Sequence, residues 1–372
     1  MVPQSNFSAE VKSFRFFFAS NACRIQRSTA YLENMKLSDL KYDYPENLIA
    51  LKPSRPTRVM WVDESGSPSE ITIDDLIKKI PKGDVVVIND TKVLKRRVFV
   101  DHSGSDLEIL FLDQLSGRQE KNYWKVLFPS KKFSVGDSVI LPNGVKMTLI
   151  EKGLPQIVSV DRQLTENDFE QMAELPLPPY IQKARGERHN NVDDKNWYQT
   201  AWANKAGSFA APTASLHFSE NDLLNLEKNG VHVLKITLHV GLGTFLPVKV
   251  DDLNDHQMHG EIYEVSKDVW SKIIDAKKQN QKIWALGTTV TRTLETIART
   301  NELSGESKIL LQVGSLFKIV DRLMTNFHQP ESTLLALVSG FSNLEIVKRN
   351  YQWAIEREFK LFSYGDFSVW IK

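Results

Sequence analysis

The C-terminal half of the chain alternates between helical and strand patterns, and this alternation constrains the fold more than any other feature. Ser219, with Asp222 three residues later, resembles a capping box, and Gly230 ends the helix that it begins. Ser266 caps a second helix in the same way. The expected helices are 219–230, 267–279 and 344–358, and the expected strands are 231–238, 282–286 and 367–371. Such alternation predicts an α/β fold with a parallel-leaning sheet covered by helices.

Residues 98–162 have a different sequence pattern. Short strand-like runs at 107–112, 123–128, 138–141, 146–150 and 156–160 are separated by turn residues such as glycine, proline and asparagine. This spacing predicts a small antiparallel β-barrel inserted into a larger domain. The main α/β catalytic domain is therefore expected to comprise 35–97 plus 163–372, and a chain of 372 residues is long enough for two cores.

The first 34 residues show neither helical nor strand periodicity. Arg15, Arg24 and Arg27 lie among serines and asparagines, and acidic residues are sparse. We expect 1–34 to be a poorly ordered, presequence-like extension, with Met35 as a natural beginning of the folded part.

Charge and cysteine content exclude several classes of protein. Lys+Arg 47 against Asp+Glu 46 gives a formal net charge of +1, so a nucleic-acid partner must be held by a local basic patch. A single cysteine, Cys23, can build neither an internal disulfide nor a thiolate zinc site. No apolar run approaches the roughly 20 residues of a membrane-spanning helix. We expect a cytoplasmic protein without a membrane partner.

Two clusters could bind a ligand at strand ends. Residues 84–88 form a β-branched strand that stops at the polar residues Asn89, Asp90 and Thr91, where α/β sites usually lie. The strand at 282–286 is followed by a glycine turn and a helix start at 287–289, whose free N–H groups suit a carboxylate or phosphate. Arg292 favours a carboxylate there, although a simple helix cap explains the threonines equally well.

Histidines are concentrated in the second half of the chain, at His217, His239, His256, His259 and His328. At least one of them is expected to act as a general base or to contact substrate. His256, His259 and Glu261 could imitate a metal site, but the zincin pattern is missing and a hydrogen-bonding network is the more common explanation. Gly241 and Gly243 lack the third glycine of a dinucleotide fingerprint, and no nucleophile elbow is present.

Basic side chains flank the predicted insertion and the proline-rich segment at 176–181. Each alone is more often a solvated surface charge, but together they could line a groove for an RNA backbone. The candidates are Lys92, Lys95, Arg96, Arg97, Lys131, Lys132, Lys183, Arg185 and Arg188.

Ten short segments occur in an order that resembles one known family. They are 89–93 (NDTKV), 175–181 (LPLPPYI), 198–200 (YQT), 207–213 (GSFAAPT), 216–218 (LHF), 237–245 (TLHVGLGTF), 256–259 (HQMH), 287–289 (GTT), 325–328 (TNFH) and 363–366 (SYGD). This pattern is similar to the S-adenosylmethionine:tRNA ribosyltransferase-isomerase family of queuosine biosynthesis, and the similarity runs from Met35 to Lys372.

The resemblance implies a fold and a reaction. The fold is an α/β main domain interrupted by a small β-barrel. The reaction transfers and isomerises the ribosyl unit of S-adenosylmethionine onto the 7-aminomethyl-7-deazaguanine wobble base of tRNA, giving epoxyqueuosine and releasing adenine and methionine. S-adenosylmethionine is then a consumed substrate, with no cofactor and no metal. The expected partner is the tRNA anticodon loop, and we expect a monomer.

The resemblance also suggests roles for individual residues. Because a sulfonium acidifies the neighbouring C5′ hydrogens, the reaction needs a base, and adenine needs an acid as it departs. His217, His239 and Asp90 are the catalytic candidates. The methionine carboxylate fits 287–289 with Arg292, and the ammonium could meet Glu295 or Glu261. Expected substrate-binding residues are Asn89, Thr91, Tyr198, Thr213, Gly241, Gly243, His259, Glu261, Gly287, Thr288, Thr289, Arg292, Glu295, Asn326, His328 and Tyr364. Expected RNA-binding residues are Lys92, Arg96, Arg97, Tyr180, Lys183 and Arg185, with Tyr180, Tyr198 or Trp202 stacking on bases.

Several positions depart from the family pattern, namely Lys92, Trp202, Ser215, Ser315 and Gln329. A divergent paralogue with a changed substrate is therefore one alternative. A non-catalytic RNA-binding protein, with structural histidines, is a second alternative from another class. A metal-dependent hydrolase is a weaker third.

Overall fold

The computed structural model describes residues 35–102, 104–115, 122–241, 243, 246 and 248–372. The extension expected at 1–34 lies outside the described residues, as do positions 242, 244 and 245 of the motif at 237–245.

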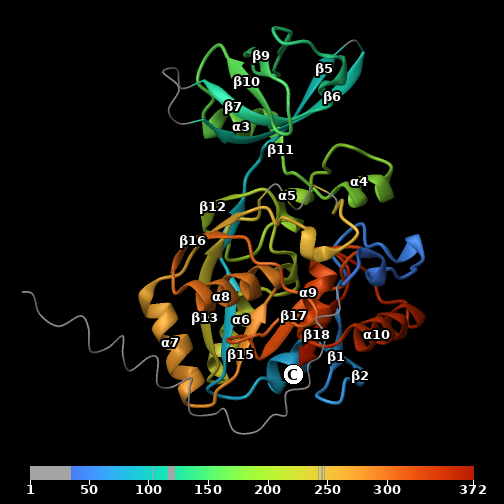
Figure 1. The fold of residues 1–372 in the computed structure, drawn as a ribbon, viewed down its shortest axis with the longest axis vertical. Helices are drawn as coiled ribbons and strands as arrows, with labels where there is room; N and C mark the ends of the chain where they lie inside the picture. The colour runs from blue at the N-terminus through green and yellow to red at the C-terminus, as the bar shows by residue number, and fades with distance from the viewer. Residues whose placement is uncertain (1–34, 103, 116–121, 242, 244–245, 247) are drawn as a thin grey trace, which may run out of the picture. The chain divides into compact units, whose positions relative to one another are not determined.

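A nine-stranded mixed sheet forms the centre of the α/β part (Figure 1). In spatial order its strands are β16 (Ser304–Ser307), β14 (Glu261–Glu264), β13 (His232–Leu238), β3 (Val85–Asn89), β15 (Ile283–Leu286), β17 (Arg322–Asn326), β18 (Phe367–Ile371), β1 (Arg58–Val62) and β2 (Pro68–Thr72). The neighbours β13, β3, β15 and β17 are parallel, whereas β14, β16 and β2 pair antiparallel at the edges. The α/β prediction with a parallel-leaning sheet is confirmed at its centre.

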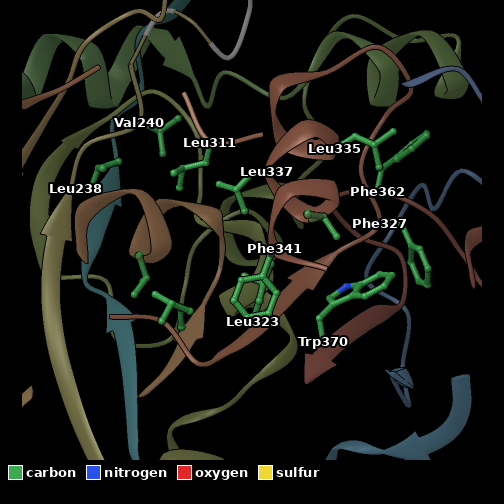
Figure 2. Close-up of a cluster of buried hydrophobic side chains, with 14 of the residues drawn as sticks. Leu238, Val240, Leu311, Leu323, Phe327, Leu335, Leu337, Phe341, Phe362 and Trp370 are labelled. Carbon is green, nitrogen blue, oxygen red and sulfur yellow. The ribbon is translucent and has the colours of Figure 1, made fainter. Parts of the chain in front are cut away.

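Both faces of this sheet are covered because its central strands are apolar on both sides. Side chains of a strand alternate between faces, so Val85 and Val87 of β3 enter one core and Val86 and Ile88 enter the other. The first face packs under α7 (Lys267–Lys278), α8 (Thr288–Thr300), α9 (Thr333–Phe341) and α10 (Leu344–Glu356). The second packs under α2 (Ile73–Lys79) and α6 (Glu220–Lys228). Figure 2 shows part of the first core, where Leu337, Phe341 and Leu323 meet.

The helix starts follow the capping signals in the sequence. Ser219 accepts a hydrogen bond from the Asp222 N–H at the start of α6, and Ser266 accepts one from Val269 at the start of α7. Both helices end within two residues of the predicted positions. The remaining short helices are α3 (Glu166–Met172), α4 (Pro179–Arg185) and α5 (Asp194–Trp197), with a 3₁₀ turn at Thr213–His217.

A second, seven-stranded sheet is antiparallel throughout and has its own apolar core. Its order is β11 (Ala173–Glu174), β5 (Arg97–His102), β6 (Ser105–Gln114), β7 (Tyr123–Leu127), β10 (Gln156–Val160), β9 (Lys146–Glu151) and β8 (Ser138–Ile140). The strands expected between 98 and 162 are all present. The hydrogen-bonded order is open between β11 and β8, so closure into a barrel stays a prediction. A two-stranded pair of β12 (Lys205–Ser208) with β4 (Thr91–Val93) completes the described strands.

Asp84 ties the beginnings of two central strands together. Its buried carboxylate accepts the Lys282 N–H at 2.9 Å and the Trp284 indole N–H at 2.8 Å, one on each oxygen. An asparagine at this position offers only one acceptor atom, so one of the two buried donors loses its partner.

We therefore expect Asp84→Asn to lower the free energy of unfolding by about 1–3 kcal/mol in a urea titration. Glu302→Gln, which removes an exposed carboxylate beyond α8, is the matched control and should change it by less than about 0.5 kcal/mol. Equal stabilities for Asp84→Asn and the wild-type protein would show that this carboxylate does not brace the sheet.

Candidate active site

Polar residues gather at the carboxyl ends of the four adjacent parallel strands. Asn89, Asp90 and Thr91 follow or end β3, His239 follows β13, and Thr288 begins α8 directly after β15 and its glycine. Since parallel strands end at the same edge of a sheet, segments distant in sequence meet there. The structure thus brings together the core of the predicted site.

Asn89 fixes the geometry of this edge. Its side-chain oxygen accepts the N–H groups of Leu238 and Thr91, each at 3.1 Å, and its amide nitrogen donates to the Leu238 carbonyl at 2.9 Å. The same nitrogen lies 3.4 Å from the Thr289 hydroxyl. Asn89 therefore joins the ends of β3 and β13 to the start of α8, and its amide is occupied by the protein itself.

His239 is held beside Asp90 at the same edge. Its Nδ1 lies 2.7 Å from the Thr91 hydroxyl, and Asp90 accepts a 2.6 Å hydrogen bond from Thr237. Burial lowers the pKa of His239 below its ordinary value of 6.5, and the nearby Asp90 carboxylate opposes that shift. A partly buried imidazole that is neutral near pH 7 can accept a proton. Gly207 packs so closely that a Cβ there would lie 2.8 Å from the ring.

His217 lies on the 3₁₀ turn next to this edge, but it is buried and its ring nitrogens are occupied. The Asn326 side-chain nitrogen donates to the Phe362 carbonyl, which fixes the amide orientation, and lies 2.8 Å from His217 Nε2. His217 Nε2 is therefore the acceptor, and the Nδ1 proton points to the Thr57 hydroxyl at 3.4 Å. Burial, together with the Arg55 charge, lowers the pKa of His217 to about 3. No lone pair is left for proton abstraction.

His328 is similarly enclosed. Its Nε2 lies 2.9 Å from the Thr325 hydroxyl, and its backbone N–H donates to the Tyr351 hydroxyl. Burial lowers its pKa to about 3. Tyr198 and Tyr364 are also buried, and burial raises the pKa of both phenols, so neither is an exposed stacking surface.

The start of α8 offers N–H groups without a side-chain cap. Gly287 has φ +99°, a conformation that favours glycine, and no side chain caps the helix. The first N–H groups of an α-helix have no intrahelical partner, so they and the threonine hydroxyls can bind an anion. Ala214, from the turn Thr213–His217, lies 3.5 Å from where a Gly287 Cβ would sit, which places that turn beside this helix start.

Two predicted charges near α8 are paired within the protein. Arg292 forms a buried ion pair with Glu261, whose other oxygen accepts the Gly241 N–H at 3.3 Å. Glu295 is fully buried and accepts three backbone N–H groups of 318–320 as well as Arg299. Glu295 therefore holds the 318–320 segment, and Arg292 is neutralised by Glu261. Gly243 packs against His259, because a Cβ there would meet His259 at 2.9 Å.

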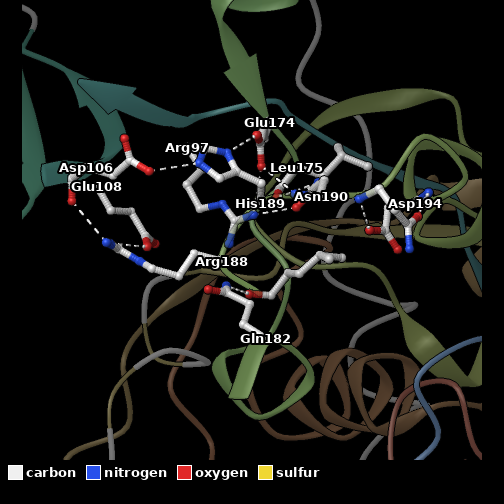
Figure 3. A network of polar contacts seen from close by, with 12 residues as sticks. Arg97, Asp106, Glu108, Glu174, Leu175, Gln182, Arg188, His189, Asn190 and Asp194 are labelled. Atoms are coloured by element: carbon white, nitrogen blue, oxygen red, sulfur yellow. Dashed lines mark hydrogen bonds and ion pairs between the residues drawn. The ribbon is translucent and has the colours of Figure 1, made fainter. Parts of the chain in front are cut away.

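Three of the arginines expected to contact RNA form ion pairs within the protein, and two of them, Arg96 and Arg97, are buried. Arg96 pairs with Glu166, Arg97 with Glu174, and Arg185 with Asp194. Figure 3 shows the network around Arg97 and Asp194, in which His189 also bridges Glu174 and Asp106. The charges of these three arginines are therefore paired with carboxylates of the protein itself. Lys92 and Lys183 are exposed, and among the described residues neither side chain has a hydrogen-bond or ion-pair partner. Tyr180 bonds to Ser363 through its hydroxyl.

Sequence reasoning missed Thr57 and Arg55, which hold His217 from 160 or more residues away along the chain. It also missed Thr237, the partner of Asp90, and Gly207, which packs on His239. No spacing pattern predicts the first two, whereas Thr237 and Gly207 lie in the motifs at 237–245 and 207–213. In the part of the chain that the structure describes, no group of three or more His, Cys, Asp or Glu side chains could hold a metal ion. The described helices include none long and apolar enough to cross a membrane.

Fold and site together define an α/β enzyme with acid–base groups at the carboxyl edge of its sheet. Residues 37–370 match the family model described as "Queuosine biosynthesis protein". The chain belongs to this family, as the resemblance of its motifs predicted.

Relatives and a solved structure agree with this assignment. Proteins named S-adenosylmethionine:tRNA ribosyltransferase-isomerase from Staphylococcus aureus strains Newman and USA300 are 39% identical over 347 residues, covering 89% of this chain and 98% of theirs. A crystal structure of S-adenosylmethionine tRNA ribosyltransferase from Thermotoga maritima is similar with a TM-score of 0.50 and 26% identity. The match covers 89% of this chain and 99% of that one.

The two buried histidines give a testable pH dependence of stability. In the unfolded chain a histidine binds a proton near pH 6.5, but His217 and His328 do so only near pH 3 when folded. The contribution of each histidine to the free energy of unfolding is thus complete above about pH 6.5. It is lost as the pH falls, by about 2 kcal/mol for each histidine between about pH 7.5 and pH 5.

Replacing His328 should remove its share of this loss. We expect the drop in unfolding free energy between about pH 7.5 and pH 5 to be about 2 kcal/mol smaller in His328→Gln than in the wild-type protein, measured by urea titration at each pH. His232→Gln, on the exposed side of β13, should keep the full drop. An unchanged drop in His328→Gln would mean that this imidazole is not kept neutral by the fold.

Proposed function

We propose that this chain transfers and isomerises the ribosyl unit of S-adenosylmethionine onto the 7-aminomethyl-7-deazaguanine wobble base of tRNA. The products are epoxyqueuosine-tRNA, adenine and methionine, and S-adenosylmethionine is consumed as a substrate. The single observation that carries the proposal is the match to relatives of this name over almost their full length. The strand-edge site supports it, because it supplies a neutral imidazole, a carboxylate and an anion-binding helix start in one place.

We assign proton abstraction to His239. A sulfonium acidifies the adjacent C5′ hydrogens, and the base that removes one must have an accessible lone pair and be neutral near pH 7. His239 meets both requirements in the tautomer whose Nδ1 carries the proton and donates to the Thr91 hydroxyl, because the Nε2 lone pair is then free and burial lowers the pKa of the ring. Asp90, close enough to affect that pKa, is the candidate to stabilise the imidazolium that forms. His217 acts instead as a positioning residue, because both of its ring nitrogens are occupied.

The methionine part of the substrate is proposed to bind at the start of α8. Its carboxylate would accept the free N–H groups and hydroxyls of Thr288 and Thr289, as at other helix N-termini that bind anions. Arg292 adds little net charge there because Glu261 neutralises it. Glu261 remains a candidate to bind the ammonium group of the methionine part. Glu295 is assigned a structural role, because its carboxylate accepts backbone N–H groups of the protein.

Further features of the proposal concern the RNA and the domains. The tRNA anticodon loop would approach the exposed Lys92 and Lys183 and not the buried arginines. We propose that 98–162 form a small inserted barrel domain within a main domain of 35–97 plus 163–372, after an extension at 1–34. A monomer acting in the cytoplasm is the corresponding expectation. The walls of the site are proposed to include further residues from the sequence prediction, namely Thr213, Gly241, Gly243, His259, Asn326, His328, Tyr198, Tyr364 and Tyr180.

Departures from the family pattern do not favour a changed substrate on structural grounds. Trp202, in place of a usual tyrosine, is buried and donates its indole N–H to the Asn89 carbonyl at 2.9 Å. Ser315 accepts the Gln312 N–H through its hydroxyl. Both side chains therefore serve the fold of neighbouring segments.

Incubation with S-adenosylmethionine and tRNA lacking only this modification tests the function. RNA-dependent release of adenine is expected. RNA binding without adenine release would favour the non-catalytic alternative, and loss of activity on chelation would favour the hydrolase.

His239→Asn tests the assignment of the base. Loss of a general base is expected to lower the rate of adenine release at least about 100-fold. His232→Asn replaces an exposed histidine at the start of β13, the strand that precedes His239, and should keep the wild-type rate. Near wild-type turnover by folded His239→Asn would exclude His239 as the base.

A further inference from the structure

A hollow of about 370 Å³ lies beside the candidate site and contains none of its predicted residues. It is lined by the loop before β1, with Lys52 and Arg55, by Trp197 of α5, and by Leu216 and Phe218 on either side of His217. Its volume lies within the range of about 300–1,000 Å³ found for small-ligand sites. The hollow and the site therefore share the segment that carries His217 and little else.

The lining of this hollow carries positive charge that the protein does not neutralise. Lys52 and Arg55 line it, and none of its lining residues is acidic. Among the described residues no carboxylate forms an ion pair with either cation. Arg55 donates only to uncharged groups, namely the Thr57 hydroxyl and the carbonyls of Leu216 and His217. An anion is the ligand that this arrangement favours.

One carboxylate, that of Asp222, acts electrostatically on Arg55, but it accepts hydrogen bonds within the protein. Asp222 influences the Arg55 guanidinium electrostatically, but its carboxylate accepts the Ser219 N–H and hydroxyl, each at 2.7 Å, as the cap of α6. This carboxylate serves the helix start and does not close the hollow. Lys52 and Arg55 thus line the hollow without a carboxylate in an ion pair with either, although Arg55 also donates to uncharged groups of the protein.

An aromatic wall stands next to the cations. Trp197 is partly buried and contacts the Tyr364 ring edge-on, with centroids 6.3 Å apart and planes at 79°. That contact fixes the orientation of the indole. Cations beside a fixed aromatic side chain suit a nucleotide of single-stranded nucleic acid, since the phosphate meets the charge and the base stacks on the ring.

We propose that this hollow is a subsite for one nucleotide of the tRNA that flanks the reacting base, with its phosphate on Lys52 and Arg55 and its base against Trp197. The inference rests on the proposed function for the identity of the RNA. Arg55 has a second consequence, because it also holds the Leu216 and His217 carbonyls. Phosphate binding and the position of the turn Thr213–His217 therefore depend on one guanidinium.

The test measures binding of tRNA that carries the precursor base, without S-adenosylmethionine, over a series of salt concentrations. Lys52→Gln should weaken binding and reduce the slope of log Kd against log salt by about 0.7–1, the effect of losing one phosphate contact. Trp197→Leu should weaken binding at least about fivefold with little change in slope. The control Lys272→Gln, on α7 and paired with Asp268, should leave both quantities unchanged.

Two outcomes would overturn the subsite. The first is a wild-type affinity and slope in folded Lys52→Gln, with folding checked by circular dichroism. The second is binding of AMP that Lys52→Gln abolishes while tRNA affinity is unchanged, which would assign the hollow to a free nucleotide. Adenine release by the wild-type protein is measured in parallel. If the wild-type protein releases adenine and Lys52→Gln leaves the slope of log Kd against log salt unchanged, the proposed subsite is wrong while the proposed function stands.

Discussion

The Asn89 side chain holds the arrangement on which the rest of the site depends. A single amide bonds to both backbone groups of Leu238 and to the Thr91 N–H, so it locks the ends of two parallel strands in one register. Thr91 in turn orients His239. Because the amide is buried, losing it would leave several backbone groups unpaired, at about 1–3 kcal/mol for each. The geometry of the candidate site is thus a consequence of how the strands β3 and β13 are joined.

Burial sorts the titratable groups into two kinds. His217 and His328 are enclosed and kept neutral, and the ion pairs of Arg292 and Arg97 are closed by partners within the fold. His239 is only partly buried, and its lowered pKa keeps it neutral without closing it off. The proposed removal of a proton beside a sulfonium and the proposed binding of RNA both require this separation, because structural charges would otherwise compete with the substrate.

The sequence predicted the central strands well and the partners of the site residues poorly. The run at 84–88 is apolar on both faces, so the strand β3 was expected, and β18 was found at the expected residues. By contrast, β16 (Ser304–Ser307) has no apolar pattern and is a strand because it pairs with β14. His217 is a catalytic candidate by its sequence context, but Asn326, 109 residues away, occupies its Nε2. Exposure of an arginine such as Arg97 also depends on a distant carboxylate, which local patterns do not reveal.

The central claim is that S-adenosylmethionine binds between the start of α8 and His239. The most direct test is a crystal structure with a non-reactive analogue in which carbon replaces the sulfonium sulfur. The account predicts the carboxylate at the first turn of α8 and the ribose C5′ within about 3.5 Å of His239. A sugar bound against another histidine, with the carboxyl edge of β3 and β13 empty, would contradict it.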